Sequence, residues 1–231
     1  MRADGRKNDD LREIKFTRNY TKNSLGSVLV EFGDTKVLVC ANCDENIPKW
    51  MDKNSNSGWL TAEYSLLPSS TSERCQRERT KISGRTQEIQ RLIGRSLRAC
   101  IDLTAIKGLT FIIDADVLQA DGGTRVASIC GAYVALYDMI AKLLKEGKLE
   151  KNPIIEPIGA VSVGILNNEV IVDLCYSEDS TAQVDSNVVL TSSGKIIEFQ
   201  ATAEGNPFSK EQMDNMYTLA KKSIDKIISL Y

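Results

Sequence analysis

Alternating and continuous apolar runs predict several short strands in the first third of the chain. Gly33-Asp34-Thr35 joins two of these runs and has the composition of a hairpin turn. Pro68 follows the fourth run, and proline is typical of a strand end because it lacks a backbone donor. Residues 1–10 are polar and are expected to form a loose arm. The predicted strands cover residues 11–18, 27–32, 36–41 and 59–67.

Apolar positions spaced by three or four residues predict three helices. They cover residues 85–102, residues 126–144, and a final segment that begins at Ser209. A strand at residues 110–118 precedes the second helix. Ser209 and Gln212 have the spacing of a capping box. The predicted buried stripe of the last helix is Met213, Met216, Ala220, Ile224 and Ile227.

The last third of the chain predicts two further hairpins. The first pairs residues 158–166 with 169–176 around Asn167-Asn168, and the second pairs residues 184–191 with 195–203. Two prolines within residues 152–157 mark the best internal boundary, so we divide the chain into parts 1–151 and 152–231. Each part is several hairpin strands followed by helix. This order predicts an α+β fold with mixed sheets and two related halves.

Composition places the chain among globular proteins and narrows its location. Hydrophobic residues make up 42% and charged residues 26% of the chain. No apolar run is expected to be long enough to span a bilayer, and the first residues have no apolar segment typical of a secretion signal. We therefore expect a cytoplasmic protein with no membrane partner.

The chain contains no histidine, which excludes several kinds of catalytic site. Ser-His-Asp and Cys-His catalysis and histidine-ligated metals are not possible. Cys40 and Cys43 form a single C-x-x-C pair without the second pair that a zinc site would need. Acid, base and metal chemistry would therefore depend on carboxylates, lysine, tyrosine or cysteine.

Charge is concentrated in one stretch, although the net charge is only −2. Residues 73–98 hold eight cations and three acids, a pattern that suggests a site for a polyanion. A solvated helix face with internal ion pairs is the usual alternative. Arg91, Arg95 and Arg98 share one face of the predicted helix. The eight cations are Arg74, Arg77, Arg79, Lys81, Arg85, Arg91, Arg95 and Arg98.

A Gly-Gly turn between the strand at 110–118 and the following helix is a candidate phosphate site. Gly122 and Gly123 allow a tight turn and close approach of a ligand, and Thr124 is expected to cap the helix. Arg125 adds a charge where free N–H groups already favour an anion. The stretch matches neither a P-loop nor a dinucleotide-binding fingerprint. An ordinary capped helix after a turn explains it equally well.

Asp179 and Asp185 form the second candidate site. Asp179 is expected in a loop and Asp185 at the start of the next strand, so their carboxylates can converge. Such an oxygen-only pair suits Mg²⁺ or Mn²⁺, which keep several waters and bridge to phosphates. Taken alone, the stretch is more often a turn stabilised by Asp, Ser and Thr side chains.

Several long ungapped segments together resemble the ribonuclease PH family of phosphate-dependent 3′→5′ exoribonucleases, which trim transfer RNA precursors. The resemblance covers essentially the whole chain. Its segments are RADGR (2–6), EFGDTKVLV (31–39), TAEYSLLP (61–68), SGRTQEIQRLIGRSLRA (83–99), DADVLQADGGTR (114–125), EDSTAQVDSNVV (178–189) and TAEGNPFS (202–209).

The resemblance implies the fold shared with ribosomal protein S5, a homohexameric ring built as a trimer of dimers, and RNA 3′ ends as substrate. Asp179 and Asp185 match the acidic pair that binds metal and supplies acid catalysis, and we favour Asp185 as the acid. The implied ligand sites are Arg85, Gly123, Thr124 and Arg125 for inorganic phosphate, and Arg74, Arg77 and Arg91 for RNA.

Three positions depart from the family pattern, namely Ser69, Cys175 and Gln183. We expect them to affect affinity or substrate range rather than chemistry. Two other functions remain open. The chain could be a non-catalytic RNA-binding ring subunit of an exosome-like assembly, although such members would lack the phosphate-site arginines or the acidic pair. It could also serve general RNA degradation within a hetero-oligomer.

Overall fold

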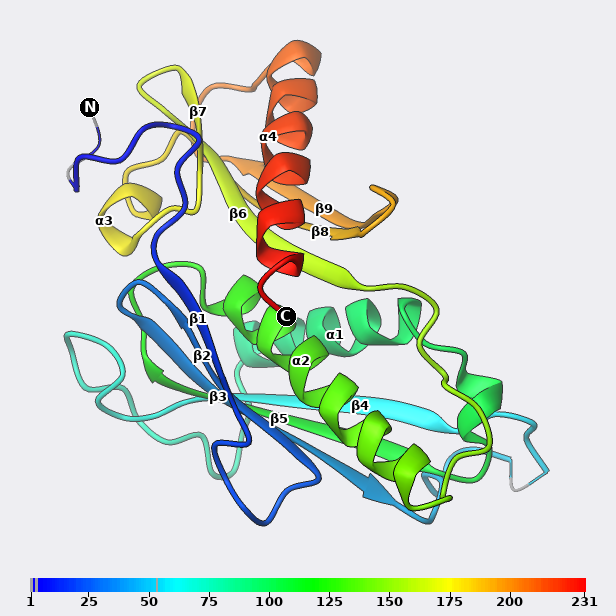
Figure 1. Ribbon diagram of the computed structural model, residues 1–231. Coiled ribbons are helices and arrows are strands. Elements are labelled where there is room, and N and C mark those ends of the chain that lie inside the picture. Colours follow the sequence, from blue (N-terminus) through cyan, green and yellow to red (C-terminus); the bar gives the residue numbers. More distant parts are fainter. Residues whose placement is uncertain (1, 3, 53) are drawn as a thin grey trace.

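Two sheets, one from each half of the chain, are held together by a long central helix in the computed structural model, which describes residues 2, 4–52 and 54–231 (Figure 1). The strands of the first half are β1 (Ile14–Arg18), β2 (Gly26–Phe32), β3 (Thr35–Asp44), β4 (Trp59–Leu66) and β5 (Thr110–Gln119). Its helices are α1 (Gly84–Ala99) and α2 (Thr124–Lys145), with a short 3-10 turn at Leu103–Ile106.

The first sheet is mixed. Its strand order is β1-β2-β3-β5-β4, with β4 parallel to β5 and the other neighbouring strands antiparallel. The parallel pair needs a crossover, and α1 supplies it. Because β4 and β5 run in the same direction, their carboxyl ends lie at the same end of the sheet. The segments that follow them, residues 67–83 and 120–123, therefore leave the sheet side by side.

The second sheet is antiparallel throughout its described strands, in the order β7-β6-β8-β9. Helix α4 packs against β6, as Figure 1 shows. The elements of this half are β6 (Ile158–Leu166), β7 (Glu169–Val172), α3 (Tyr176–Asp179), β8 (Val184–Thr191), β9 (Ile196–Ala203) and α4 (Lys210–Ile228).

Helix α2 joins the two halves. It packs on β2 and β3 of the first sheet and on β6 of the second, and buried side chains of both halves form one continuous core. A Cβ on Gly26 would lie 2.0 Å from the carbonyl oxygen of Ala135, so glycine permits this close contact. The expectation that no run is long enough to span a bilayer was wrong for α2. Its apolar surface is mostly buried inside the protein, as in a core helix.

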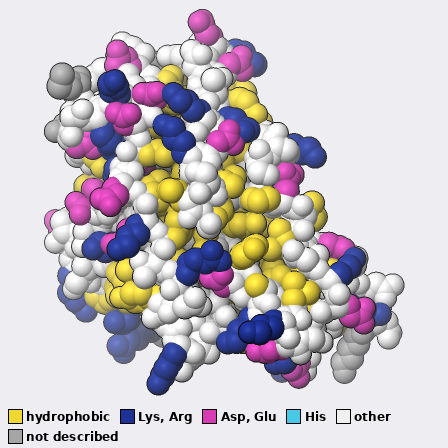
Figure 2. All heavy atoms as spheres, viewed as in Figure 1, with side chains coloured by type: hydrophobic (Ala, Val, Ile, Leu, Met, Phe, Trp, Pro, Cys, Tyr) yellow, Lys and Arg dark blue, Asp and Glu magenta, His cyan; other side chains and the backbone are white. Residues whose placement is uncertain are grey.

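The predicted fold class, α+β with mixed sheets from hairpins packed with helices, is confirmed. Helix α4 begins where its sequence predicts, with a capping box between Ser209 and Gln212. Helix α1 is capped by Ser83 and ends at Ala99, three residues before the predicted end. In Figure 2, apolar side chains gather over the middle of the visible face, where the two halves meet.

The predicted strand at residues 169–176 was wrong beyond Val172. Asp173 has a positive φ of 55° and a fully buried side chain, and the chain turns there into α3. Asp179 is therefore the last residue of a short helix rather than part of a loop. The ion pairs of Asp173 with Arg6 and Arg12 explain the turn, and they involve residues too distant in sequence for a local pattern to predict.

The prediction of a loose N-terminal arm was also wrong for the residues that the structure describes; Met1 and Ala3 lie outside them. Arg2 is only 6% exposed. It donates to both carboxylate oxygens of Glu178, at 2.7 and 2.6 Å, and to the carbonyl oxygens of Val172 and Asp173. The arm is thus tied to β7 and α3 in the second half of the chain.

Candidate functional site

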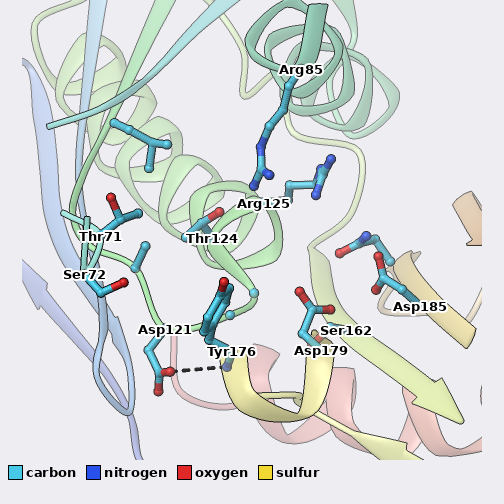
Figure 3. A pocket seen from close by; sticks show the side chains of 15 residues that line it. Thr71, Ser72, Arg85, Asp121, Thr124, Arg125, Ser162, Tyr176, Asp179 and Asp185 are labelled. Atoms are coloured by element: carbon cyan, nitrogen blue, oxygen red, sulfur yellow. Dashed lines mark hydrogen bonds between the residues drawn. The ribbon is translucent and has the colours of Figure 1, made fainter. Parts of the chain in front are cut away.

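A pocket of about 450 Å³ lies where the two halves meet. Figure 3 shows its two walls: arginines reach in from the first half, and a pair of aspartates faces them from the second. The first half contributes Leu66, Thr71, Ser72, Arg85, Ala120, Asp121, Gly122, Gly123, Thr124 and Arg125. The second half contributes Ser162, Tyr176, Asp179, Asp185 and Asn187.

The arginine wall is formed by the first turns of α1 and α2. Arg85 is exposed and points from α1 toward the start of α2. Arg125 donates through Nη2 to Glu88 at 3.0 Å, and its buried Nε has no partner among the described atoms. A buried donor without a partner is costly, so this nitrogen favours a bound acceptor. Two guanidinium groups thus face one cavity and keep hydrogen-bond donors that can bind a ligand.

The start of α2 provides further donors. Gly123, with a φ of 69°, is the N-cap residue, and no side chain of the residues that the structure describes caps this end of the helix. The prediction that Thr124 is the N-cap was therefore wrong. Thr124 is the first helical residue, and its hydroxyl accepts a hydrogen bond from the buried hydroxyl of Tyr64 at 3.0 Å. An uncapped first turn leaves its backbone N–H groups free to bind an anion.

The two glycines of the turn have different roles. Gly123 lines the pocket. Gly122 also lines the pocket, and in addition it faces the backbone of the second half: a Cβ on it would lie 2.5 Å from the carbonyl oxygen of Leu174 and 2.8 Å from the nitrogen of Tyr176. Its φ of 75° also favours glycine. The Gly-Gly pattern therefore reflects packing between the halves as well as access for a ligand.

The acidic wall consists of Asp179, at the end of α3, and Asp185, the second residue of β8. Asp185 is held in the sheet between Gly164 of β6 and Thr202 of β9. Burial and the neighbouring charge of Asp179 raise the pKa of Asp185 to about 6, and Arg125 acts in the opposite direction. Two carboxylates that meet in this way share a proton or a cation more readily than they both ionise.

The donor set fits a hard divalent cation. No group of three or more Cys, Asp or Glu suited to a metal occurs in the described part of the chain. Mg²⁺, however, needs only one or two carboxylates, because waters and phosphate oxygens complete its shell. The paired carboxylates lie in an open pocket beside the oxygen-bearing side chains of Ser162 and Asn187. A cation here would also relieve the repulsion between the carboxylates.

Helix α3, which carries Asp179, is fixed by buried charge. Glu178 is 4% exposed and forms an ion pair with Arg2 at 2.6 Å. Burial opposes its charge, but hydrogen bonds from Arg2 and from the Cys175 backbone outweigh burial, and the pKa of Glu178 is lowered. The Tyr176 N–H also donates to Asp121 at 3.2 Å, across the junction of the halves (Figure 3). These contacts hold the acidic wall against the Gly-Gly turn.

The structure brings six of the nine predicted site residues into this pocket, namely Arg85, Gly123, Thr124, Arg125, Asp179 and Asp185. Arg74 and Arg77 lie on the exposed segment between β4 and α1 and do not line the pocket. Thr71 and Ser72 of the same segment do line it. Arg91 lies further along α1 and lines a separate depression with Trp59 and Arg98.

Sequence reasoning missed several residues of the pocket. Tyr176 is 63% exposed at its mouth, and Asp121 hydrogen-bonds its backbone. Both adjoin predicted motifs, so proximity in sequence could have indicated them, whereas Ser162 lies inside an apolar strand with no such signal. Two departures from the family pattern have structural contacts. Cys175 is the N-cap residue of α3, and Gln183 accepts a hydrogen bond from the backbone of Asn168.

Comparison with known protein families identifies the class of this fold. The model for domain 1 of the 3′ exoribonuclease family matches residues 10–141, and the model for domain 2 matches residues 156–223. The chain therefore belongs to the 3′ exoribonuclease family, also called the RNase PH family. The resemblance seen in the sequence and the fold it implied are both confirmed.

Solved structures with the same fold include exosome subunits. A structure of the Archaeoglobus fulgidus exosome with RNA bound to the active site is 22% identical, with a TM-score of 0.82, covering 98% of this chain and 91% of that chain. An archaeal exosome core is 21% identical, with a TM-score of 0.80, covering 99% and 90%. Rice (Oryza sativa) Rrp46 is 20% identical, with a TM-score of 0.80, covering 98% and 96%.

Proposed function

We propose that this protein is a phosphate-dependent 3′→5′ exoribonuclease that shortens RNA by releasing nucleoside 5′-diphosphates and can add nucleotides in the reverse direction. The observation that carries the proposal is the pairing of two walls of opposite charge in one pocket, Arg85 and Arg125 facing Asp179 and Asp185. Phosphoryl transfer between two anions requires neutralisation of their charge and a group that donates a proton to the leaving oxygen.

Inorganic phosphate would bind against the arginine wall. Arg85 and Arg125 supply charge-assisted donors, and Gly123 and Thr124 place the free N–H groups of the α2 start beside them. Neutralising the bound phosphate lowers the repulsion it meets on approaching an RNA phosphodiester. The unpartnered Nε of Arg125 supports an acceptor at this position.

In the reaction, an oxygen of inorganic phosphate attacks the last internucleotide phosphorus, and the bond from that phosphorus to the 3′-oxygen breaks. The products are a nucleoside 5′-diphosphate and an RNA one nucleotide shorter, whose new 3′-oxygen takes up a proton. Asp185 lines the pocket and is the carboxyl group we assign to this proton. Asp179 and Asp185 would together hold Mg²⁺ or Mn²⁺, whose charge stabilises the transferring phosphoryl group when bound.

RNA would reach the pocket as a single-stranded 3′ end. Thr71 and Ser72 place the segment that carries Arg74 and Arg77 at the rim of the pocket. We propose that these two arginines contact the phosphates upstream of the cleaved bond, and that 3′ ends of transfer RNA precursors in the cytoplasm are the substrates. The likeness to exosome cores supports a ring of subunits, and we propose a homohexamer.

A second candidate function is that of a non-catalytic RNA-binding subunit of an exosome-like ring. One contact favours it: Arg125 already pairs with Glu88 at 3.0 Å, which partly neutralises the arginine wall. The similarity to exosome structures supports this function as well. The presence of both acids and both arginines in one pocket is the argument for the enzyme.

A 3′-end assay separates the two functions. An RNA with a single-stranded 3′ tail is incubated with Mg²⁺, with and without inorganic phosphate, beside an Asp185→Asn variant. We expect release of nucleoside diphosphates that requires phosphate and is lost in the variant. RNA binding without release would support the non-catalytic subunit. Release of monophosphates without phosphate would indicate a hydrolase and contradict the phosphate site.

A further inference from the structure

Both tryptophans of the protein lie on one surface, outside the pocket described above. This surface, here called the tryptophan surface, includes Trp50 and a depression of about 330 Å³ on α1 and β4. The residues that line the depression are Trp59, Thr61, Ala62, Gln87, Gln90, Arg91 and Arg98.

The two tryptophans are held differently. Trp59 lies under the guanidinium of Arg98, whose Cζ is 4.7 Å from the ring centroid, and Arg98 is fixed by a 3.0 Å hydrogen bond to the Leu60 carbonyl. Trp50 packs edge-to-face on Trp59, with centroids 5.0 Å apart, yet is 69% exposed. A buttressed ring that still shows most of its surface to solvent is a ready platform for stacking.

The charge of this surface is positive and not neutralised locally. No acidic side chain lines the depression among the described residues. Burial and the charge of Arg95 lower the pKa of Arg98, as expected where cations gather. Arg91 is exposed beside it, and Gln87 and Gln90 add neutral amide groups that can both donate and accept hydrogen bonds.

Stacking rings, unneutralised arginines and amides are the combination with which proteins bind single-stranded nucleic acid. Tryptophan and arginine are also common in protein interfaces, but the amides of Gln87 and Gln90 and two arginines with no acidic side chain among the described residues of the depression favour an anionic partner with stacking bases. We propose that the tryptophan surface binds single-stranded RNA, with a base stacked on Trp50 and the backbone phosphates near Arg91 and Arg98.

This inference rests on the proposed function for the direction of the RNA. Helix α1 begins with Arg85 at the pocket and carries Arg91 and Arg98 on the tryptophan surface. Arg85 and Arg98 are separated by about 20 Å along the helix. An RNA with its 3′ end in the pocket can therefore follow α1 and meet Trp50 with nucleotides upstream of the reacting bond. This gives long substrates a contact that very short ones lack.

Intrinsic fluorescence provides a direct test when it is excited at the long-wavelength edge of tryptophan absorption, where the seven tyrosines absorb little and the two tryptophans supply the signal. The protein is titrated with a long oligouridylate and with a uridine dinucleotide, without phosphate or metal, so that no reaction occurs. We expect the long RNA to quench the fluorescence and the dinucleotide to leave it unchanged. Absence of quenching while the long RNA binds, as shown by anisotropy of a labelled RNA, would overturn the proposal.

Variants test the same surface by affinity. Trp50→Ala is expected to weaken binding of the long RNA about 10-fold and leave dinucleotide binding unchanged, while Trp50→Phe retains most of the affinity. Tyr20→Ala, which removes another exposed aromatic ring, is the matched control. Arg91→Ala is expected to reduce the slope of log affinity against log salt by about 0.7.

Two outcomes would contradict this role. Unchanged affinity of Trp50→Ala and Arg91→Ala for the long RNA would exclude the surface. Sedimentation of the RNA-free Trp50→Ala variant gives the second outcome. If its subunit assembly changes and its RNA affinity falls in proportion to that change, the surface is a contact between copies of the chain. Because these measurements need no turnover, they remain decisive even if the 3′-end assay shows no phosphorolysis.

Discussion

The two walls of the pocket are built in opposite ways. Within the described part of the chain, the arginine wall has few internal partners: Arg85 is exposed, and Arg125 has one ion pair and one buried nitrogen without a partner. The acidic wall is fixed from behind, by the strand that holds Asp185 and by the Arg2–Glu178 pair that anchors α3. Such a difference suits a site where the acids are preorganised and the arginines keep free donors for the ligand.

The largest expected effect comes from breaking the anchor of the acidic wall. Glu178→Ala leaves the buried guanidinium of Arg2 without its carboxylate and should reduce the free energy of unfolding by about 3–5 kcal/mol. Chemical denaturation measures the loss. Glu150→Ala, which removes an exposed carboxylate, is the control. If both variants lost equally little unfolding free energy, the acidic wall would not depend on the Arg2–Glu178 pair.

The next effect concerns the arginine wall. Arg125→Ala should lower phosphate-dependent release of nucleoside diphosphates on the order of 100-fold, because it removes donors that act on the charged oxygens of the reaction. Binding of RNA in the absence of phosphate should change little, and stability should change less than in Glu178→Ala. Arg79→Ala, at an exposed position outside the pocket, is the matched charge control. Equal losses in phosphate use and RNA binding would contradict the role of Arg125.

A third substitution tests whether the walls depend on their junction. Gly122→Ala forces a methyl group to within 2.5 Å of the Leu174 carbonyl and should destabilise the protein by about 2 kcal/mol. Gly147→Ala is a close control, since Gly147 has a similar φ of 70° but no neighbouring atom of the described residues within 4 Å of the added Cβ. Thermal unfolding of both variants separates backbone strain from contact between the halves. Similar losses of stability in the two variants would show that the effect of Gly122→Ala comes entirely from backbone strain.

The smallest expected effect is the pH dependence of the acidic wall. Because the pKa of Asp185 is raised to about 6 in the folded protein, the folded state binds more protons than the unfolded state between the ordinary aspartate pKa and about 6. Stability attributable to Asp185 should therefore fall as pH rises through this window. After allowance for partial exposure, the change is about 1 kcal/mol.

The difference between wild type and Asp185→Asn isolates this contribution. We expect the variant to gain stability relative to wild type as pH rises from 4 to 7, in denaturation curves without metal. Added Mg²⁺ should reduce the difference in unfolding free energy between the variant and wild type at pH 7, since it stabilises the ionised pair of Asp179 and Asp185. A gap that is constant with pH would show that Asp185 keeps an ordinary pKa.

The sequence predicted those parts of the fold that depend on neighbours along the chain. The Asn167-Asn168 hairpin and the Ser209 capping box are local patterns, and both are where the sequence indicates. The turn at Asp173 and the packing of the arm depend on ion pairs with residues more than 150 positions away, so no local pattern could reveal them. Thr124 has a residue type favoured as a helix cap, but the Gly123 conformation and the Tyr64 hydrogen bond give it a different role.

The site residues could be predicted in identity but only in part in placement. Arg85, Arg125, Asp179 and Asp185 share a pocket, as expected from motifs that converge. Arg91 does not join them, because the helical period turns it toward β4 and Trp59 rather than toward the start of α2. Ser162 could not be predicted because it occurs within an otherwise apolar strand, whereas Asn187 lies two residues after Asp185 on the same face of β8, so the period of the strand could have indicated it.

The Arg2–Glu178 pair also sets a time order during synthesis. The partners are 176 residues apart, and at ribosomal speeds of about 5–20 residues per second Arg2 waits roughly 10–35 s for Glu178 to be made. Until then the first half can form its sheet and place its arginines, but α3 has not been anchored. Asp185 has not yet been added to the chain. A nascent or truncated chain would thus hold the arginines that we propose to bind phosphate without the acids that complete the pocket, so the proposed reaction would be confined to chains that have finished both halves.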